Sequence, residues 1–154
     1  MVHELHVRQI NMMTPVYDLA LDTAQIERIQ KATLTTADYG IQQAHGLFGS
    51  AEWWKKISSG ELPTITLSGK ITKVYMGSMG DWPMFEFTDS SGDTHSFTRE
   101  AQDAERSRLY AVGLAVEVDY VVQKHKKSFT GGSLDTKVVT AIRIQGEQDV
   151  TPNA

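Results

Sequence analysis

Alternating apolar and polar positions dominate the chain after Thr64, and turn residues bound each run of alternation. The first run, from Ile65 to Tyr75, has Gly69 in its middle, and an interior glycine is typical of a sharp bend in a barrel strand. Four further runs have the same character and cover residues 84–88, 94–98, 115–123 and 137–144. The pattern therefore predicts five strands between residues 64 and 145.

Helical spacing replaces this alternation before Thr64. Asp22 and Gln25 form a capping pair ahead of apolar residues at helical intervals, which predicts a helix over residues 23–33. Ser50 is placed to cap a short second helix that ends at Ser58-Ser59-Gly60. Weaker signals predict a short strand over residues 2–10, a helical turn over 39–44 and a charged surface helix over 99–109. Pro15 is expected to interrupt whatever element precedes it.

Four short segments, taken in order, resemble the oligonucleotide/oligosaccharide-binding fold. Gly69-Lys70-Ile71-Thr72-Lys73-Val74 resembles the first strand of that fold, and Phe87-Thr88-Asp89-Ser90-Ser91-Gly92 is similar to its turn between strands two and three. Gly113-Leu114-Ala115-Val116-Glu117-Val118 resembles the entry to its fourth strand, and Val138-Val139-Thr140-Ala141-Ile142-Arg143-Ile144 resembles its fifth. The likeness covers about half of the chain.

The resemblance implies a mainly β fold, a five-stranded Greek-key barrel, with an α-helical N-terminal extension. The expected domains are an extension over 1–63 that packs on the barrel, the barrel over 64–145 and a flexible tail over 146–154. A ligand would lie across the second and third strands, between the first inter-strand loop and the loop that joins the last two strands. The resemblance thus implies a binding module for single-stranded DNA or RNA.

Composition and charge limit the alternatives. The chain has 154 residues, 40% of them hydrophobic, and contains no cysteine, which excludes disulfides and thiolate metal sites. The net charge of -4 argues against binding a polyanion by bulk charge, but residues 64–145 hold ten basic and ten acidic residues. No stretch approaches eighteen apolar residues and no signal peptide is evident, so we expect a cytoplasmic protein without a membrane partner.

A basic loop joins the last two predicted strands and is the first candidate site. It carries Lys124, Lys126 and Lys127 together with Phe129, near two glycines. Lysines neutralise phosphates and an aromatic ring stacks on bases, so this loop is a candidate contact for single strands. The alternative is a hairpin tip that its charges keep in solvent.

The first inter-strand loop supplies a second candidate, in which Tyr75 and Trp82 would frame a groove and stack on bases. Lys70, Lys73 and Arg99 would add positive charge, which Glu86 opposes if Phe85 and Phe87 point into the core. Alternatively, Trp82 and the methionines of this loop plug the barrel mouth or pack against Trp53.

Phe48, Trp53 and Trp54 form an aromatic cluster that is too apolar to be left in water. The cluster either folds onto the barrel or forms a surface for a protein partner or for self-association. The second possibility supports the alternative function, a protein-interaction or structural adaptor domain without nucleic-acid binding.

Catalysis, metal binding and cofactor binding find little support in the sequence. The five histidines are scattered, and no serine, histidine and aspartate show the spacing of a nucleophile motif. Turn chemistry explains Asp89 and Asp93 better than acid–base chemistry does. We therefore expect no enzyme, no metal and no cofactor.

Overall fold

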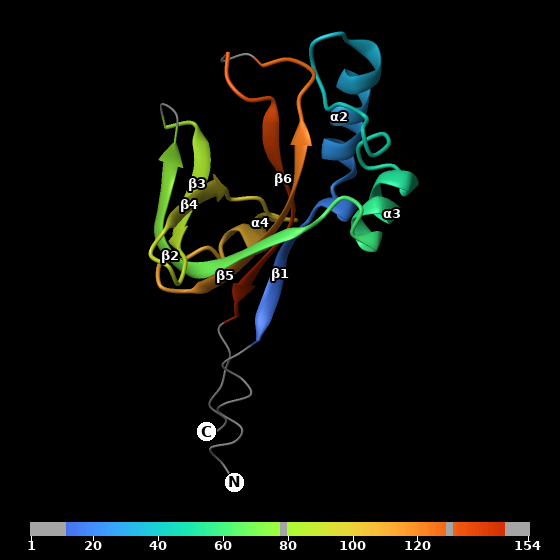
Figure 1. Ribbon diagram of the computed structural model, residues 1–154. Helices are drawn as coiled ribbons and strands as arrows, with labels where there is room; N and C mark the ends of the chain where they lie inside the picture. The colour runs from blue at the N-terminus through green and yellow to red at the C-terminus, as the bar shows by residue number, and fades with distance from the viewer. Residues whose placement is uncertain (1–11, 78–79, 129–130, 147–154) are drawn as a thin grey trace. The chain divides into compact units, whose positions relative to one another are not determined.

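The computed structural model describes residues 12–77, 80–128 and 131–146, and this part of the chain is mainly β. The strands are β1 (Met13–Asp18), β2 (Ile65–Gly77), β3 (Trp82–Thr88), β4 (Thr94–Thr98), β5 (Ala115–Lys124) and β6 (Asp135–Gln145). The helices are η1 (Leu19–Leu21), α2 (Thr23–Thr35), α3 (Ala51–Ser59) and α4 (Ala104–Ser107) (Figure 1).

The strands form one sheet of six antiparallel strands in the order β1-β6-β5-β2-β3-β4. The mainly β prediction is confirmed. The sheet is not closed, however, because β1 and β4 stand at its two ends, so the five-stranded barrel is not what the structure shows.

The additional strand, β1, runs through Pro15, which the sequence pattern marks as an interruption. Proline removes a backbone donor, and a strand tolerates that loss at the edge of a sheet. β1 is such an edge strand, so its proline is compatible with the strand. The strand expected over residues 2–10 lies outside the described residues.

The two main helices form where their caps predict them. The Asp22 side chain accepts from the Gln25 amide at the start of α2, and the Ser50 side chain accepts from the Trp53 amide at the start of α3. The charged segment after β4 forms only the four-residue helix α4. The expected helical turn over 39–44 does not form. Tyr39 and Gly40 lie in a bend, and Ile41 makes an isolated β-bridge with His125.

The chain divides into two compact units that do not follow its linear order. Unit 1 comprises Leu67–Val118 with the described residues of Met1–Tyr17 and Ala141–Ala154, and unit 2 comprises Asp18–Thr66 and Asp119–Thr140. The long strands β2, β5 and β6 each contribute residues to both units.

Unit 1 contains the two consecutive hairpins β2–β3 and β3–β4. A β-bulge interrupts the first, because Ile71 lies opposite Phe87 and the next pair is Lys73 opposite Glu86, which leaves Thr72 as an extra residue. Gly69 approaches the neighbouring strand so closely that a Cβ there would lie 2.2 Å from the carbonyl oxygen of Thr88.

The unit 1 core is aromatic on one face of β3 and β4. Phe85, Phe87 and Phe97 are buried, with ring centroids between 6.0 and 6.4 Å apart. Tyr110 packs 4.8 Å from Phe85, and its hydroxyl donates to the carbonyl oxygen of Glu100. Burial, and to a lesser degree the charge of Glu100, raises the pKa of Tyr110, so the phenol stays a neutral donor.

Candidate functional site

The lysines of the basic loop each contact other residues of unit 2. The Lys124 ammonium lies 2.6 Å from Oδ1 of Asp135, and that of Lys127 lies 3.7 Å from Oδ2 of Asp38. The Lys126 ammonium donates to the carbonyl oxygens of Thr33 and Thr36. The predicted phosphate contacts are therefore engaged within the protein. Phe129, the stacking residue predicted beside them, lies outside the described residues.

Lys126 has a clear structural role at the end of α2. Its two acceptors belong to the last turn of that helix and to its C-cap residue. The final carbonyls of a helix lack intrahelical donors and carry partial negative charge, so an ammonium group there satisfies acceptors and opposes the helix dipole. This lysine fixes the loop to the helix.

The aromatic cluster of unit 2 is mostly core. Phe48 and Trp53 are buried, whereas Trp54 is half-buried. The Trp53 ring lies 4.7 Å from that of Phe48 and 4.9 Å from that of Trp54. Of the two possibilities that the sequence left open, the structure favours the inward one, and Phe48 and Trp53 are not available as a partner surface.

A buried polar chain that the sequence did not reveal holds this cluster in place. The indole Nε1 of Trp53 donates to Oε1 of Gln123 over 3.0 Å. This bond identifies the other end of the amide as its nitrogen, which lies 3.4 Å from Nδ1 of His45 and donates to it. His45 therefore carries its ring proton on Nε2 when neutral. The buried positions of β5 change phase after Tyr120, so that Val121 and Gln123 are buried and Val122 is exposed. The apolar alternation that includes Val122 places Gln123 outward, so the sequence pattern carried no signal for this buried glutamine.

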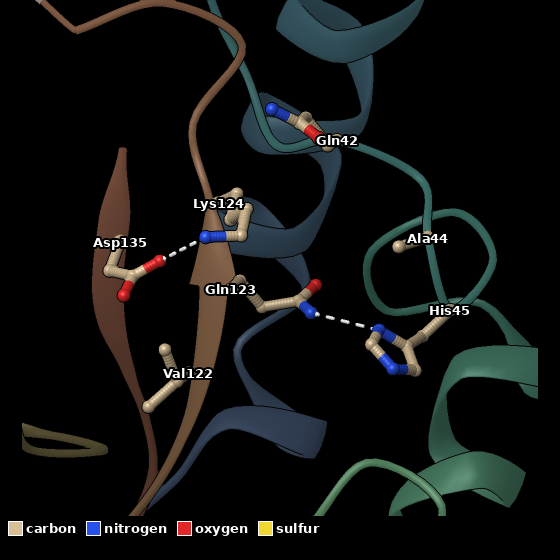
Figure 2. Close-up of a pocket in the computed structure, with 7 residues that line it drawn as sticks. All are labelled: Gln42, Ala44, His45, Val122, Gln123, Lys124 and Asp135. Atoms are coloured by element: carbon tan, nitrogen blue, oxygen red, sulfur yellow. Dashed lines mark hydrogen bonds and ion pairs between the residues drawn. The ribbon is translucent and has the colours of Figure 1, made fainter. Parts of the chain in front are cut away.

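A pocket of about 260 Å³ lies beside this chain within unit 2 (Figure 2). Its lining consists of Gln42, Ala44, His45, Val122, Gln123, Lys124 and Asp135. The volume is below the range of about 300–1,000 Å³ that is usual for small-molecule sites. Asp135 is paired with Lys124 and His45 with Gln123, so the lining lacks the carboxylate–imidazole contact of acid–base catalysis.

The bulge at Thr72 decides where the remaining predicted residues point. Continuous alternation would place Lys73 and Tyr75 on the same side of β2 as the buried Ile71. The extra residue instead moves them to the outer side, where Lys73 lies opposite Glu86 and Tyr75 opposite Met84. The Lys73 ammonium lies 4.5 Å from the centroid of the Tyr75 ring, a cation–π contact.

Trp82 stands near the end of the β2–β3 hairpin, with 55% of its surface exposed. Its indole Nε1 donates to Oγ1 of Thr98 over 2.9 Å. The Arg99 guanidinium donates from NH2 to the carbonyl oxygen of Tyr75 over 3.2 Å and contacts the sulfur of Met76 at 3.4 Å. Trp82, Tyr75, Lys73, Lys70 and Arg99 all belong to unit 1, whereas the three loop lysines belong to unit 2.

The tight turn after β3 contains a carboxylate whose pKa is perturbed. Nε2 of His95 lies 2.8 Å from Oδ2 of Asp89, and the backbone amides of Ser91 and Asp93 donate to Oδ1 of Asp89. The hydrogen bond from His95 is the largest influence on the pKa of Asp89 and lowers it. The arrangement organises the turn, as the sequence suggests.

Within residues 12–77, 80–128 and 131–146, no group of three histidine, aspartate or glutamate side chains is arranged to hold a metal ion. In the same described part of the chain, no helix has both the length and the apolar character needed to cross a bilayer.

Comparison with known proteins corrects the sequence interpretation. No curated protein matches the chain. The sequence model of one family, described as Immunity protein RhsI2, matches residues 13–145, which run from the start of β1 to the end of β6. This match overturns the resemblance to the oligonucleotide/oligosaccharide-binding fold and the single-stranded nucleic-acid function that it implied. The chain belongs to the Immunity protein RhsI2 family.

Proposed function

We propose that this protein is an immunity protein that binds a cognate toxin of the Rhs type and blocks its action. The observation that carries the proposal is the family match, which spans every strand of the sheet. The protein partner takes the place of nucleic acid, so the alternative prediction of a protein-interaction domain is the one that agrees with the family.

We propose that binding alone provides the protection. In the pocket of unit 2, Lys124 pairs with Asp135, and His45 accepts a hydrogen bond from Gln123. The basic loop holds its lysines against acceptors of the same protein. Neither feature presents a reactive group to a substrate. Both are therefore compatible with a domain that acts by binding a partner. Residence in the cytoplasm stays a prediction from the sequence.

Co-expression with the cognate toxin domain tests this function. Cells that express the toxin alone are expected to stop growing, and cells that also express this protein are expected to grow. Size-exclusion chromatography of the two purified proteins should show a complex that elutes before either component. A toxin that arrests growth equally with and without this protein, and forms no complex with it, would contradict the proposal.

A further inference from the structure

The end of the β2–β3 hairpin in unit 1 gathers the residue types that protein interfaces favour. Tyr75 and Trp82 lie on one face of this hairpin end and Met76, which Arg99 contacts, lies on the other, and tryptophan, tyrosine, methionine and arginine are the types enriched at interface centres. Trp82 and Met76 are 55% and 49% exposed. The pocket of unit 2, by contrast, is bordered by a lysine–aspartate pair, and both residue types are depleted at such centres.

The exposed indole is held in one orientation before any partner binds. Its only polar atom already donates to Thr98, so the ring keeps its apolar faces for another surface. Tyr75 is held on the same face of the hairpin by the ammonium of Lys73. A side chain that is fixed in advance loses little conformational entropy on binding, which favours affinity.

The core does not account for this exposure. The inward face of β3 is occupied by Phe85 and Phe87, both completely buried. Trp82 alternates with them and therefore lies on the opposite face, with Met84 and Glu86. Hence Trp82 does not plug the interior of unit 1, and its ring is left to solvent.

The charges of unit 1 indicate what kind of surface would fit. The described residues of unit 1 contain six basic and eight acidic residues. Asp81, next to Trp82, is exposed and forms no ion pair with the described residues. A partner with basic side chains around an apolar cleft would complement both the indole and the adjacent Asp81.

We propose that Trp82, flanked by Tyr75, is the anchor that enters an apolar cleft on the toxin, and that basic residues border this cleft. The inference rests on the proposed function and names its contact surface. Met76, on the other face of the same hairpin end, lies at the margin of the contact.

The decisive experiment measures toxin binding by the full-length protein and its Trp82→Ala variant with surface plasmon resonance. We expect the dissociation constant to rise by at least about 30-fold for Trp82→Ala, and by less for Tyr75→Ala and Met76→Ala. Val112→Ala is the matched control, because Val112 is 64% exposed and belongs to the same unit. It should bind as the wild type does. Thermal unfolding verifies that each variant is folded.

Tryptophan fluorescence gives a second measurement that does not depend on a loss of binding. Toxin binding should shift the emission of Trp82 to shorter wavelength as the ring leaves water. In Trp82→Phe, which retains an aromatic ring, a complex should still form more readily than with Trp82→Ala. The shift should then be missing, because Trp53 is already buried and the half-buried Trp54 belongs to unit 2 and not to the hairpin.

The charge of the toxin cleft is tested by Asp81→Lys and by salt. We expect association to become about 3- to 10-fold slower for Asp81→Lys at low ionic strength, with dissociation little changed, and the difference to shrink as salt is added. Faster association of this variant would overturn the basic character that we assign to the cleft.

The outcomes distinguish a failure of the proposed Trp82 anchor from a failure of the proposed immunity function. If the wild type binds the toxin and a folded Trp82→Ala variant binds within about 2-fold of it, the anchor is refuted and the immunity function stands. If the wild type does not bind, both fail. If Val112→Ala weakens binding as much as Trp82→Ala does, the loss is not specific to the hairpin and the anchor is likewise refuted.

Discussion

The two compact units use their tryptophans in opposite ways. In unit 2, Trp53 is completely buried and donates to Gln123, which is buried as well. In unit 1, Trp82 also donates its indole hydrogen to a side chain of the same protein, but more than half of its surface remains in solvent. The hydrogen bond supports packing in the first case and sets the direction of an exposed ring in the second.

The basic residues extend this comparison. Lys124, Lys126 and Lys127 in unit 2 contact carboxylates and carbonyl oxygens of the same unit. In unit 1, Lys73 instead holds an aromatic ring that points outward. Lys137 of unit 2 also lies over an aromatic ring, 5.3 Å from the centroid of Tyr120, but that ring is buried. The exposure of the ring therefore distinguishes Lys73, whereas residue type does not.

Trp53→Ala should produce the largest effect on stability and sharpen the comparison most. Removing a buried tryptophan is expected to lower the free energy of unfolding by about 3–5 kcal/mol. Trp82→Ala should cost less than about 1 kcal/mol, because it removes an exposed ring and one hydrogen bond. Urea denaturation of both variants measures the difference. Equal losses would mean that the two indoles have the same structural role.

Gln123→Leu tests how much the hydrogen bond from Trp53 contributes to stability, apart from the packing of the side chain at position 123. The leucine is apolar but leaves the indole hydrogen of Trp53 without its acceptor. We expect a loss of about 1–3 kcal/mol in the free energy of unfolding, the usual cost of an unsatisfied buried donor. Gln123→Glu keeps an acceptor and serves as the comparison at low pH, where the carboxyl group is neutral. An unchanged urea midpoint for Gln123→Leu would show that the hydrogen bond contributes nothing.

Lys126→Met tests whether the basic loop is structural. The methionine keeps most of the chain length but cannot donate to the carbonyl oxygens at the end of α2. The expected loss is about 0.5–1 kcal/mol in the free energy of unfolding. Lys70→Met, an exposed strand lysine of unit 1, is the control and should change the stability by less than about 0.5 kcal/mol. If both variants behave alike, the helix-end contact of Lys126 is not stabilising.

Asp89→Asn should give the smallest effect, and one that depends on pH. The pKa of Asp89 is lowered in the folded protein, so its ionised form favours folding above the unfolded pKa of about 4. That contribution is lost as the pH falls through the lowered value. Asp89→Asn should therefore be less stable than the wild type at neutral pH and converge with it in acid. Denaturation at a series of pH values checks this, and a constant difference would rule out the mechanism.

Most helices and strands could be located from the sequence, because caps and turns are formed by residues that are close together in the chain. The capping pair of Asp22 and Gln25 placed α2, and the turn after Thr88 placed the β3–β4 hairpin. The strand β1 was missed because the tolerance of Pro15 depends on its position at the sheet edge, which only the assembled sheet defines. The prediction of a closed barrel was wrong for a similar reason. The order of strands along the sequence does not determine whether the two edge strands of the sheet pair with each other.

The candidate site was predicted as a set of residue types rather than as a surface. Tyr75 and Trp82 were selected as stacking residues because aromatic side chains beside a loop are unusual, and their role in the proposed toxin contact stays a prediction. The engagement of Lys126 with α2 was invisible, since it joins positions 93 and 90 residues apart in the sequence. The nature of the partner could not be obtained from these residues at all, because a phosphate groove and a protein interface use overlapping sets of side chains.

The unpaired Thr72 on β2 has a consequence for how this surface could change over evolutionary time. Deleting that single residue would restore uninterrupted pairing and leave Tyr75 on the outer side, because Lys73 would still lie opposite Glu86 and Tyr75 opposite Met84. Keeping Thr72 but pairing it with the neighbouring strand would instead turn Tyr75 inward and Met76 outward. The bulge thus determines which chemical face the hairpin offers, and a change of pairing there would alter partner preference without replacing a single aromatic residue.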